Sequence, residues 1–275
     1  MKELNLQEIQ KIELNILLVL KKICDDNDLK LYLCGGTLLG AVRHSGFIPW
    51  DDDIDVCMPR PDYNRLISVL HQKDKLPRHL QMICFEDGNF TLPYMKIFDK
   101  RTHYQTQYFK HRDDTGIWID IFPYDGLPED NNEVKKIYKT IGRYRKYLML
   151  NMAVPSEGKN FVKRILKPAY IALIKKIYPA QKSGEKIVEM AQRYPYEETE
   201  KVGAVTWGLY GLGERVNKSE YEIPYNVNFE GYSFQTMSCW ETYLTGLYGD
   251  YMKLPPKEKR TTHDMEVWFE DGEEI

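Results

Sequence analysis

The sequence has few cysteines and almost no excess of charge, and each shortage argues against a class of protein. Its five cysteines are scattered and no two form a C-x-x-C pair, which argues against a zinc ribbon or a redox pair. Most of them stand among apolar neighbours, as reduced buried cysteines do, so we expect a cytosolic setting. The formal net charge of -3 gives no global sign of a nucleic-acid partner.

Long hydrophobic segments are also missing. No run of about 18 apolar residues occurs, so no membrane-spanning helix is expected. The opening segment MKELNLQEIQKIELNILL has neither an uninterrupted apolar stretch nor a small-residue cleavage site, so no signal peptide is expected. We therefore predict a cytoplasmic protein.

What the sequence contains is the composition of an ordinary globular protein, with 43% hydrophobic and 29% charged residues. Apolar side chains at steps of three and four predict an amphipathic helix over residues 4–23. Further helices are expected at 36–43 and 59–72. Short runs of branched and aromatic residues predict strands at 31–34, 54–58, 80–85, 94–98, 103–109 and 117–122.

Beyond residue 128 the pattern becomes mostly helical. Helices are expected at about 132–152, 159–178, 183–194 and 239–247, with a glycine-containing hairpin at FEGYSF and a polar tail. We predict an α/β (α+β) protein with a mixed sheet flanked by helices. A catalytic core over 1–128 is followed by a mostly helical part over 129–275, which either forms its own unit or packs on the same sheet.

Four aspartates stand in and before one predicted strand, in the segment CGGTLLGAVRHSGFIPWDDDIDVCMPR, residues 34–60. They are Asp51, Asp52, Asp53 and Asp55. Because alternate residues of a strand point to one face, Asp53 and Asp55 are expected side by side. Two like charges so close are unfavourable unless a cation neutralises them, and oxygen ligands alone favour Mg²⁺ or Mn²⁺.

Two other interpretations of this acidic run exist. An EF-hand loop starting at Asp51 fails because Val56 replaces the glycine of position six and Asp62 replaces the glutamate of position twelve. A solvated turn is the simpler interpretation of an isolated run of this kind. We favour the metal site because a glycine turn precedes the run and a lone strand aspartate follows it.

That lone aspartate is Asp120, within GIWIDIFPYDG. Isoleucines fill one face of its predicted strand, and Asp120 shares the other face with Trp118 and Phe122. A carboxylate in an apolar strand normally needs a partner. Two carboxylates on one strand and a third on a neighbour form the arrangement that clamps divalent ions at a phosphoryl centre. Polymerase-beta-like nucleotidyltransferases use it after a glycine turn that binds phosphates at a helix N-terminus, and Gly35, Gly36 and Thr37 take that place here.

At this point a family resemblance becomes specific. The block GGTLLGAVRHSGFIPWDDDIDVCMPRPDY resembles the signature of the LicD family, to which the fukutin-related transferases are also similar. The segments YMKIFDKRT, WIDIFPYDGLP and YGDYMKLPPKEKRTTH agree with it. The resemblance implies a nucleotidyltransferase fold, Mg²⁺ dependence and a CDP-activated donor. Family members transfer phosphocholine, or in other branches a polyol phosphate, to a sugar hydroxyl. The cysteine set of the zinc-binding insert is missing, so no zinc is expected.

Carried over by position, the resemblance makes Asp53 and Asp55 metal ligands, with Asp51 and Asp52 as alternatives. It makes Asp120 a third ligand or the base that takes the acceptor proton. The candidate phosphate-binding cations are Arg43, Lys96 and Arg101 in the matching motifs, and Lys259, Arg260 and His263 in a basic tail that could fold over the diphosphate. Each cation could instead be a solvated surface charge.

The resemblance implies transfer of phosphocholine from CDP-choline to a teichoic-acid or lipopolysaccharide sugar. The alternatives are transfer of ribitol or glycerol phosphate, transfer of the nucleotide itself, and an inactive glycan-binding protein. A choline donor needs an aromatic or acidic box for its quaternary ammonium. Spacing does not select that box from the candidates Tyr94, Tyr124, Tyr210, Tyr248 and Trp207. The acceptor sugar, the alcohol, the number of metal ions and the oligomeric state stay open.

Residues 159–182 hold seven basic residues and no acidic one, with apolar residues between them. This pattern predicts a helix lying on an anionic membrane surface, bent at Pro168. Such a helix suits an enzyme whose acceptor is a lipid-linked glycan. A helix that packs on the core and exposes a basic side is the alternative.

Overall fold

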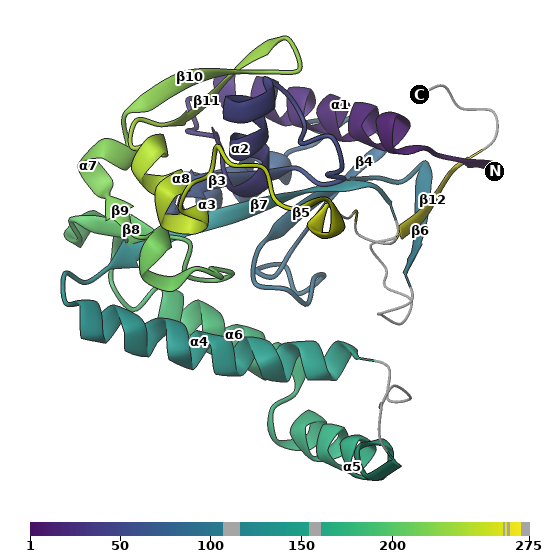
Figure 1. Cartoon of the computed structure of the whole chain (residues 1–275), viewed down its shortest axis with the longest axis vertical. Coiled ribbons are helices and arrows are strands. Elements are labelled where there is room, and N and C mark those ends of the chain that lie inside the picture. Colours follow the sequence, from purple (N-terminus) through teal and green to yellow (C-terminus); the bar gives the residue numbers. More distant parts are fainter. Residues whose placement is uncertain (107–115, 154–160, 261, 263–264, 271–275) are drawn as a thin grey trace.

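A mixed sheet forms the centre of the protein in the computed structural model, which describes residues 1–106, 116–153, 161–260, 262 and 265–270. Helices cover both faces of the sheet (Figure 1), which confirms the predicted α+β class. The strand order is β2 (Tyr32–Leu33), β3 (Asp55–Pro59), β7 (Trp118–Leu127), β5 (Met95–Asp99) and β4 (Leu80–Cys84). β3 and β7 run parallel, and the other neighbours in this order are antiparallel.

Three helices from the first part of the chain cover one face. They are α1 (Leu6–Asp25), α2 (Gly35–His44) and α3 (Arg60–Leu70). The side chain of Asn5 caps the start of α1, and Glu8 completes a capping box. The apolar stripe of α1 packs against β5 and β7, where Ile119 and Ile121 are buried. The predicted amphipathic helix is therefore confirmed.

The opposite face is covered by α4 (Asn131–Met152) and α6 (Ala180–Ala191), which pack against each other. Their residues Ile137 and Ile187 share a buried cluster with Phe98 and Leu127 of the sheet. α5 (Phe161–Ile177) lies beyond α4 and contacts it. The predicted helices of this region are confirmed with shifted ends, and residues 159 and 160 lie outside the described residues.

The next part of the chain returns to the sheet. β8 (Lys201–Gly203) pairs with the end of β7, and β9 (Val216–Asn217) pairs with β8. The short helix η1 (Tyr196–Glu198) precedes β8, η2 (Gly211–Glu214) lies between β8 and β9, and α7 (Lys218–Tyr221) follows β9. The hairpin of β10 (Pro224–Phe229) and β11 (Tyr232–Met237) confirms the predicted turn, and α8 (Trp240–Tyr248) then packs on α2 and η2.

A second, small sheet joins the two ends of the described chain. Its order is β1 (Lys2–Glu3), β12 (Met265–Phe269) and β6 (Thr102–Thr106). The predicted polar tail is therefore wrong, because after η3 (Lys257–Lys259) the chain forms a strand that buries Val267 and Phe269. The strand predicted at 103–109 is confirmed as β6 up to residue 106, and its last residues are not among those described.

No helix in the described ranges is long and apolar enough to cross a membrane.

Candidate active site

Asp55, Asp120 and Lys96 form a row across three neighbouring strands. Asp55 of β3 pairs in register with Asp120 of β7, which pairs with Lys96 of β5. Residues in register point to the same face of a sheet, so the three side chains lie together. The ammonium nitrogen of Lys96 is 3.4 Å from Oδ1 of Asp120 and 3.7 Å from the centre of the Trp118 ring. The strand aspartate thus has the partners that its apolar surroundings required.

The electrostatics of Asp55 show how crowded the carboxylates are. Burial raises the pKa of Asp55 well above its usual range, and the charges of Asp53, Asp120 and Asp51 raise it further. Lys96 opposes these effects by lowering the pKa of Asp55. The cluster therefore carries a repulsion that a bound cation would relieve.

The acidic loop before β3 differs from the expected strand. β3 begins at Asp55, so Asp53 precedes the strand and is not its neighbour within a regular ladder. Asp52 is buried, whereas Asp51 and Asp53 are partly exposed. Gln10 of α1 donates a hydrogen bond from its Nε2 to the carbonyl of Asp51 at 2.8 Å, which holds the loop against α1.

The two glycines at the start of α2 let the helix approach these carboxylates closely. A Cβ on Gly35 would lie 3.0 Å from Oδ2 of Asp55, and one on Gly36 would lie 3.0 Å from Oδ2 of Asp51. Gly35 also has a φ of +53°, which side-chain-bearing residues rarely adopt. The positive end of the α2 dipole is therefore next to the carboxylate cluster.

Two hydroxyl groups position the residues of this corner. The backbone N–H of Asp55 donates to Oγ1 of Thr37 at 2.8 Å, and Thr37 is buried. The backbone N–H of Gly35 donates to the hydroxyl of Tyr243 on α8 at 3.1 Å. α2, β3 and α8 are thus joined at the point where the acidic loop ends.

Two predicted cations meet beside the acidic loop. The Arg260 guanidinium lies 4.9 Å from the ring centre of Trp50, the residue that precedes Asp51. Arg43 donates from Nη1 to the carbonyl of Tyr251 at 2.9 Å. Burial lowers the pKa of Arg43, and the charge of Arg260 lowers it further. The segment after α8 therefore brings a second positive charge to this side of the site, while Lys259 is exposed.

Arg101 lies apart from this group. It follows the end of β5, where its Nη2 is 2.6 Å from Oδ2 of Asp99 and its guanidinium packs over Phe269. These contacts join β5 to the small sheet. His263 lies outside the described residues.

Glu13 is a buried carboxylate that the sequence interpretation missed. It lies on the apolar stripe of α1 and is 2% exposed. Burial raises the pKa of Glu13 well above its usual range, and the charges of Asp53, Asp52 and Asp51 raise it further. A carboxylate at the helical spacing of Ile9, Ile12 and Ile16 was a signal available in the sequence.

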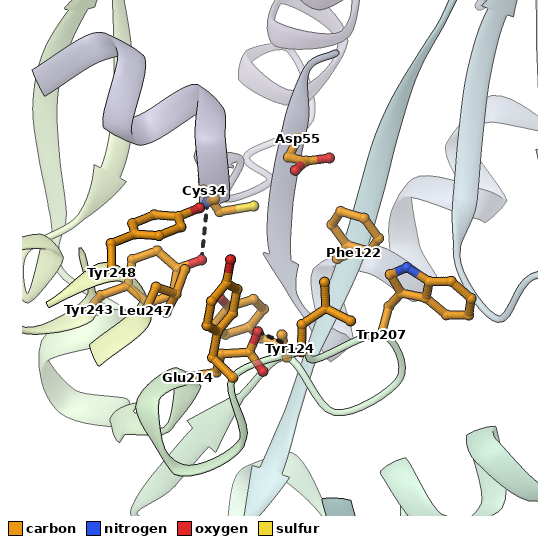
Figure 2. Close-up of a pocket in the computed structure, with 13 residues that line it drawn as sticks. Cys34, Asp55, Phe122, Tyr124, Trp207, Glu214, Tyr243, Leu247 and Tyr248 are labelled. Atoms are coloured by element: carbon orange, nitrogen blue, oxygen red, sulfur yellow. Dashed lines mark hydrogen bonds between the residues drawn. The ribbon is translucent and has the colours of Figure 1, made fainter. Parts of the chain in front are cut away.

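A pocket of about 150 Å³ opens beside Asp55 (Figure 2). Six of its lining residues are aromatic, and we call them the aromatic box: Phe122, Tyr124, Trp207, Tyr210, Tyr243 and Tyr248. Four of the five predicted box candidates are among them. Tyr94, the fifth, packs with its ring centre 5.4 Å from that of Trp207. Phe122 and Tyr243 were not predicted for the box, because only the fold brings β7, the 204–214 loop and α8 together.

Glu214 is the acidic member of the pocket apart from Asp55. It is 5% exposed, and its Oε1 accepts a 3.0 Å hydrogen bond from the backbone N–H of Leu209. Burial raises the pKa of Glu214 to about 7, although the N–H groups of Leu209 and Tyr210 and the charge of Arg145 act in the opposite direction. No sequence pattern singled out this residue, because the helix η2 that it ends is only four residues long.

The donor atoms suit a hard divalent cation, although they do not form a ready metal cage. Within the part of the chain that the structure describes, no group of three or more His, Cys, Asp and Glu side chains is arranged to hold a metal ion. The fit is one of chemistry and charge: the carboxylates of Asp55 and Asp120 lie in one row, with Asp51 and Asp53 close enough to raise the pKa of Asp55. The divalent cation stays a prediction.

Comparisons with known proteins add to this geometry. The model of the family LicD/FKTN/FKRP, nucleotidyltransferase domain, matches residues 28–155, which include the carboxylate row. Over 272 residues the chain is 35% identical to the lipopolysaccharide cholinephosphotransferase LicD of Haemophilus influenzae, covering 97% of this chain and 98% of that protein. An uncharacterized protein of Rickettsia prowazekii is 34% identical over 107 residues, which are 38% of this chain and 35% of that protein.

Proposed function

Since the chain belongs to the LicD/FKTN/FKRP family, we propose that it is a phosphotransferase that moves phosphocholine from CDP-choline to a sugar hydroxyl of a lipopolysaccharide precursor. The observation that carries this proposal is the row of Asp55, Asp120 and Lys96 beside the aromatic pocket. The similarity to the Haemophilus enzyme extends over nearly the whole of both chains, which supports a shared reaction.

The carboxylates of Asp53, Asp55 and Asp120 would hold Mg²⁺ or Mn²⁺, with Asp51 at the edge of the same cluster. When bound, the cation neutralises charge on the diphosphate and stabilises the leaving CMP. Lys96 partly balances the negative charge of the row, because its ammonium nitrogen is 3.4 Å from Oδ1 of Asp120. Thr37 fixes the backbone of Asp55, so the carboxylate is held in place before substrate arrives.

The transfer itself is a substitution at phosphorus. The oxygen of the sugar hydroxyl forms a bond to the choline-bearing phosphorus of CDP-choline, and the bond from that phosphorus to the bridging oxygen of CMP breaks. The proton of the hydroxyl passes to a carboxylate of the cluster, and CMP leaves as an anion. Arg43 and Arg260 stand beside the acidic loop, where they would bind the departing phosphate.

The test is release of CMP from CDP-choline in the presence of a lipopolysaccharide-precursor acceptor, for the wild type and Asp55→Asn. We expect release that requires Mg²⁺, stops with EDTA and falls by at least about a hundredfold in the variant, since one charged ligand is lost. Asp26→Asn is the matched control, because Asp26 is an exposed residue at the end of α1 that pairs with Lys22.

Three further arms separate the alternatives. CDP-ribitol and CDP-glycerol test the alcohol, and a teichoic-acid acceptor tests the glycan. Measurement of pyrophosphate separates phosphoalcohol transfer from nucleotide transfer. Activity of folded Asp55→Asn equal to that of the wild type, or no CMP release from any of these donors, would refute the proposal.

A further inference from the structure

We propose that the aromatic box and Glu214 form the subsite for the trimethylammonium group of the donor, so that these residues select choline among CDP-linked alcohols. This inference rests on the proposed function and goes beyond it, because it names the side chains that recognise the transferred alcohol. The ligand of the pocket beside Asp55 is then a small organic cation.

The size of the pocket is the first argument. A volume of about 150 Å³ is well below the roughly 300–1,000 Å³ of sites that bury a whole drug-sized ligand. A cavity of about this size accommodates benzene. The pocket therefore fits the compact head of an alcohol and excludes a complete nucleoside.

The chemistry of the wall is the second argument. Aromatic rings attract cations through the negative faces of their π-systems, and quaternary ammonium groups are recognised by boxes of such rings. Here the rings come from separate elements: Phe122 and Tyr124 from β7, Trp207 and Tyr210 from the loop before η2, and Tyr243 and Tyr248 from α8. The hydroxyl groups of a neutral polyol would find no hydrogen-bond partner on the ring faces that form most of this wall, so burying them here would be unfavourable.

Glu214 supplies an independent observation. Its Oε2 is buried and accepts no hydrogen bond from the described residues. A buried carboxylate oxygen without a partner normally lowers the stability of the folded protein, unless a cation or a hydrogen-bond donor lies next to it. A trimethylammonium group has no N–H to donate, so it neutralises such a carboxylate by charge alone.

Arg145, whose charge acts on Glu214, does not fill this role. Arg145 donates from Nη1 to the carbonyl of Gly208 at 2.6 Å, and its guanidinium lies 5.6 Å from the centre of the Trp207 ring. Its charge lowers the pKa of Glu214, yet Oε2 of Glu214 has no hydrogen-bond partner among the described residues, Arg145 included. The acidic charge is thus only partly compensated within the protein.

The two acidic ends of the pocket also match the charge pattern of the donor. Figure 2 shows Asp55 at one end of the pocket and Glu214 at the other, with rings of the aromatic box between them. Phosphocholine likewise carries its phosphate and its ammonium group at opposite ends of a short linker. With the ammonium group at Glu214, the phosphorus faces the carboxylate row.

The experiment compares the affinities of three probes in the presence of Mg²⁺: CDP-choline, its neutral isostere CDP-3,3-dimethylbutanol, and CDP. The isostere has the same shape without the charge, so the ratio of the two affinities measures recognition of the cation. We expect the wild type to bind CDP-choline on the order of tenfold more tightly than the isostere. This preference should fall to about threefold or less in Glu214→Gln and in Tyr210→Leu, while affinity for CDP stays the same.

Matched variants guard against a general loss of structure. Tyr210→Phe keeps the ring and should keep the preference, and Tyr210 is 44% exposed, so its substitution leaves the core intact. Glu241→Gln changes an exposed glutamate of α8 and should also behave as the wild type. A loss of preference in both controls would overturn the assignment.

The remaining outcomes separate this inference from the proposed function. If CDP binds and CMP is released but CDP-choline and the isostere bind equally, or the preference survives in Glu214→Gln, the subsite assignment is wrong and the transferase stands. If none of the three probes binds to the folded protein, both proposals fail.

Discussion

At the scale of single residues, the buried carboxylate of Glu214 destabilises the ligand-free protein, and the same carboxylate is the group that we expect to bind the trimethylammonium group of the donor. Its pKa is raised from 4.5 to about 7 by burial. The folded state therefore holds a proton between these two pH values that the unfolded state has lost, and stability decreases as the pH rises through about 7. Residues that bind charge inside a protein commonly have this double effect.

Glu214→Gln should for this reason stabilise the protein in alkaline solution. We expect the free energy of unfolding to rise by about 1–3 kcal/mol at pH 8, because the neutral amide avoids the cost of a buried charge. At pH 4, where Glu214 is mostly protonated in both the folded and the unfolded state, the difference should be close to zero. Urea unfolding of both proteins at the two pH values checks this, and a variant less stable than the wild type at pH 8 would contradict it.

Asp120 and Glu214 show what a sequence reveals about a site and what it hides. Asp120 could be predicted because it is the one carboxylate in the predicted strand at 117–122, and its row with Asp55 follows from strand pairing. Glu214 ends the helix η2, which is too short to show periodicity. Its importance depends on burial by segments remote in sequence, namely α4 and α8, and no local pattern records that burial.

At the scale of elements, the ion pair of Arg60 and Asp125 joins α3 to β7 away from the carboxylate row. Nε and Nη2 of Arg60 donate to the two carboxylate oxygens of Asp125 at 2.7 and 2.9 Å, and both side chains are buried. A bidentate pair of this kind fixes the position of a helix on a sheet. Arg60 also lies 3.6 Å from Glu86, so the connection reaches the end of β4.

Removing one member of this pair should be more harmful than removing both. Arg60→Met leaves the Asp125 carboxylate buried without its partner, and we expect a loss of about 3–5 kcal/mol in the free energy of unfolding. The double variant Arg60→Met with Asp125→Leu should recover most of that loss. The control on the same helix is Arg65→Met, whose exposed pair with Asp62 should change stability by about 1 kcal/mol or less. Equal stability of the single and double variants in urea unfolding would contradict the expectation.

The elements that the sequence predicted well are those with strong local periodicity, such as α1 and β7. The last strand was missed for the opposite reason. Only Val267 and Phe269 alternate with more exposed neighbours in β12, and the strand forms because β1 and β6 accept it from positions far away in the chain. A short strand of this kind cannot be distinguished from a polar tail by its composition.

At the scale of the whole molecule, α5 lies beyond α4, on the outer side of the helical layer (Figure 1). Its side chains Ile171 and Ile174 are buried, whereas Tyr170, Leu173 and Ile177 are exposed. Lys175 and Lys176 are exposed beside them, and the side chains of residues 161–167 are outside the described set. Exposed apolar and basic residues on one helix favour the proposed contact with an anionic membrane that carries a lipid-linked acceptor.

Charge reversal on α5 tests that contact. We expect the double variant Lys175→Glu with Lys176→Glu to bind anionic vesicles at least about tenfold more weakly, since each basic residue near the surface contributes about 1 kcal/mol. Lys73→Glu with Lys75→Glu, in an exposed loop after α3, makes the same change of net charge and should bind as the wild type. Flotation of both variants with vesicles measures the difference, and equal binding would leave α5 as a packing helix with a solvated basic side.

The small sheet has a consequence for how the protein is made. β12 lies between β1 and β6, so a strand near the end of the chain separates two strands that are synthesised much earlier. Until β12 is synthesised, Lys2–Glu3 and Thr102–Thr106 have no central partner, and until α8 is synthesised the hydroxyl of Tyr243 cannot reach Gly35. Pairing over such sequence distances is slow, because a large loop must close first. The nascent chain therefore completes its catalytic corner only after α8 is synthesised and its small sheet only after β12, and a product truncated before α8 has neither.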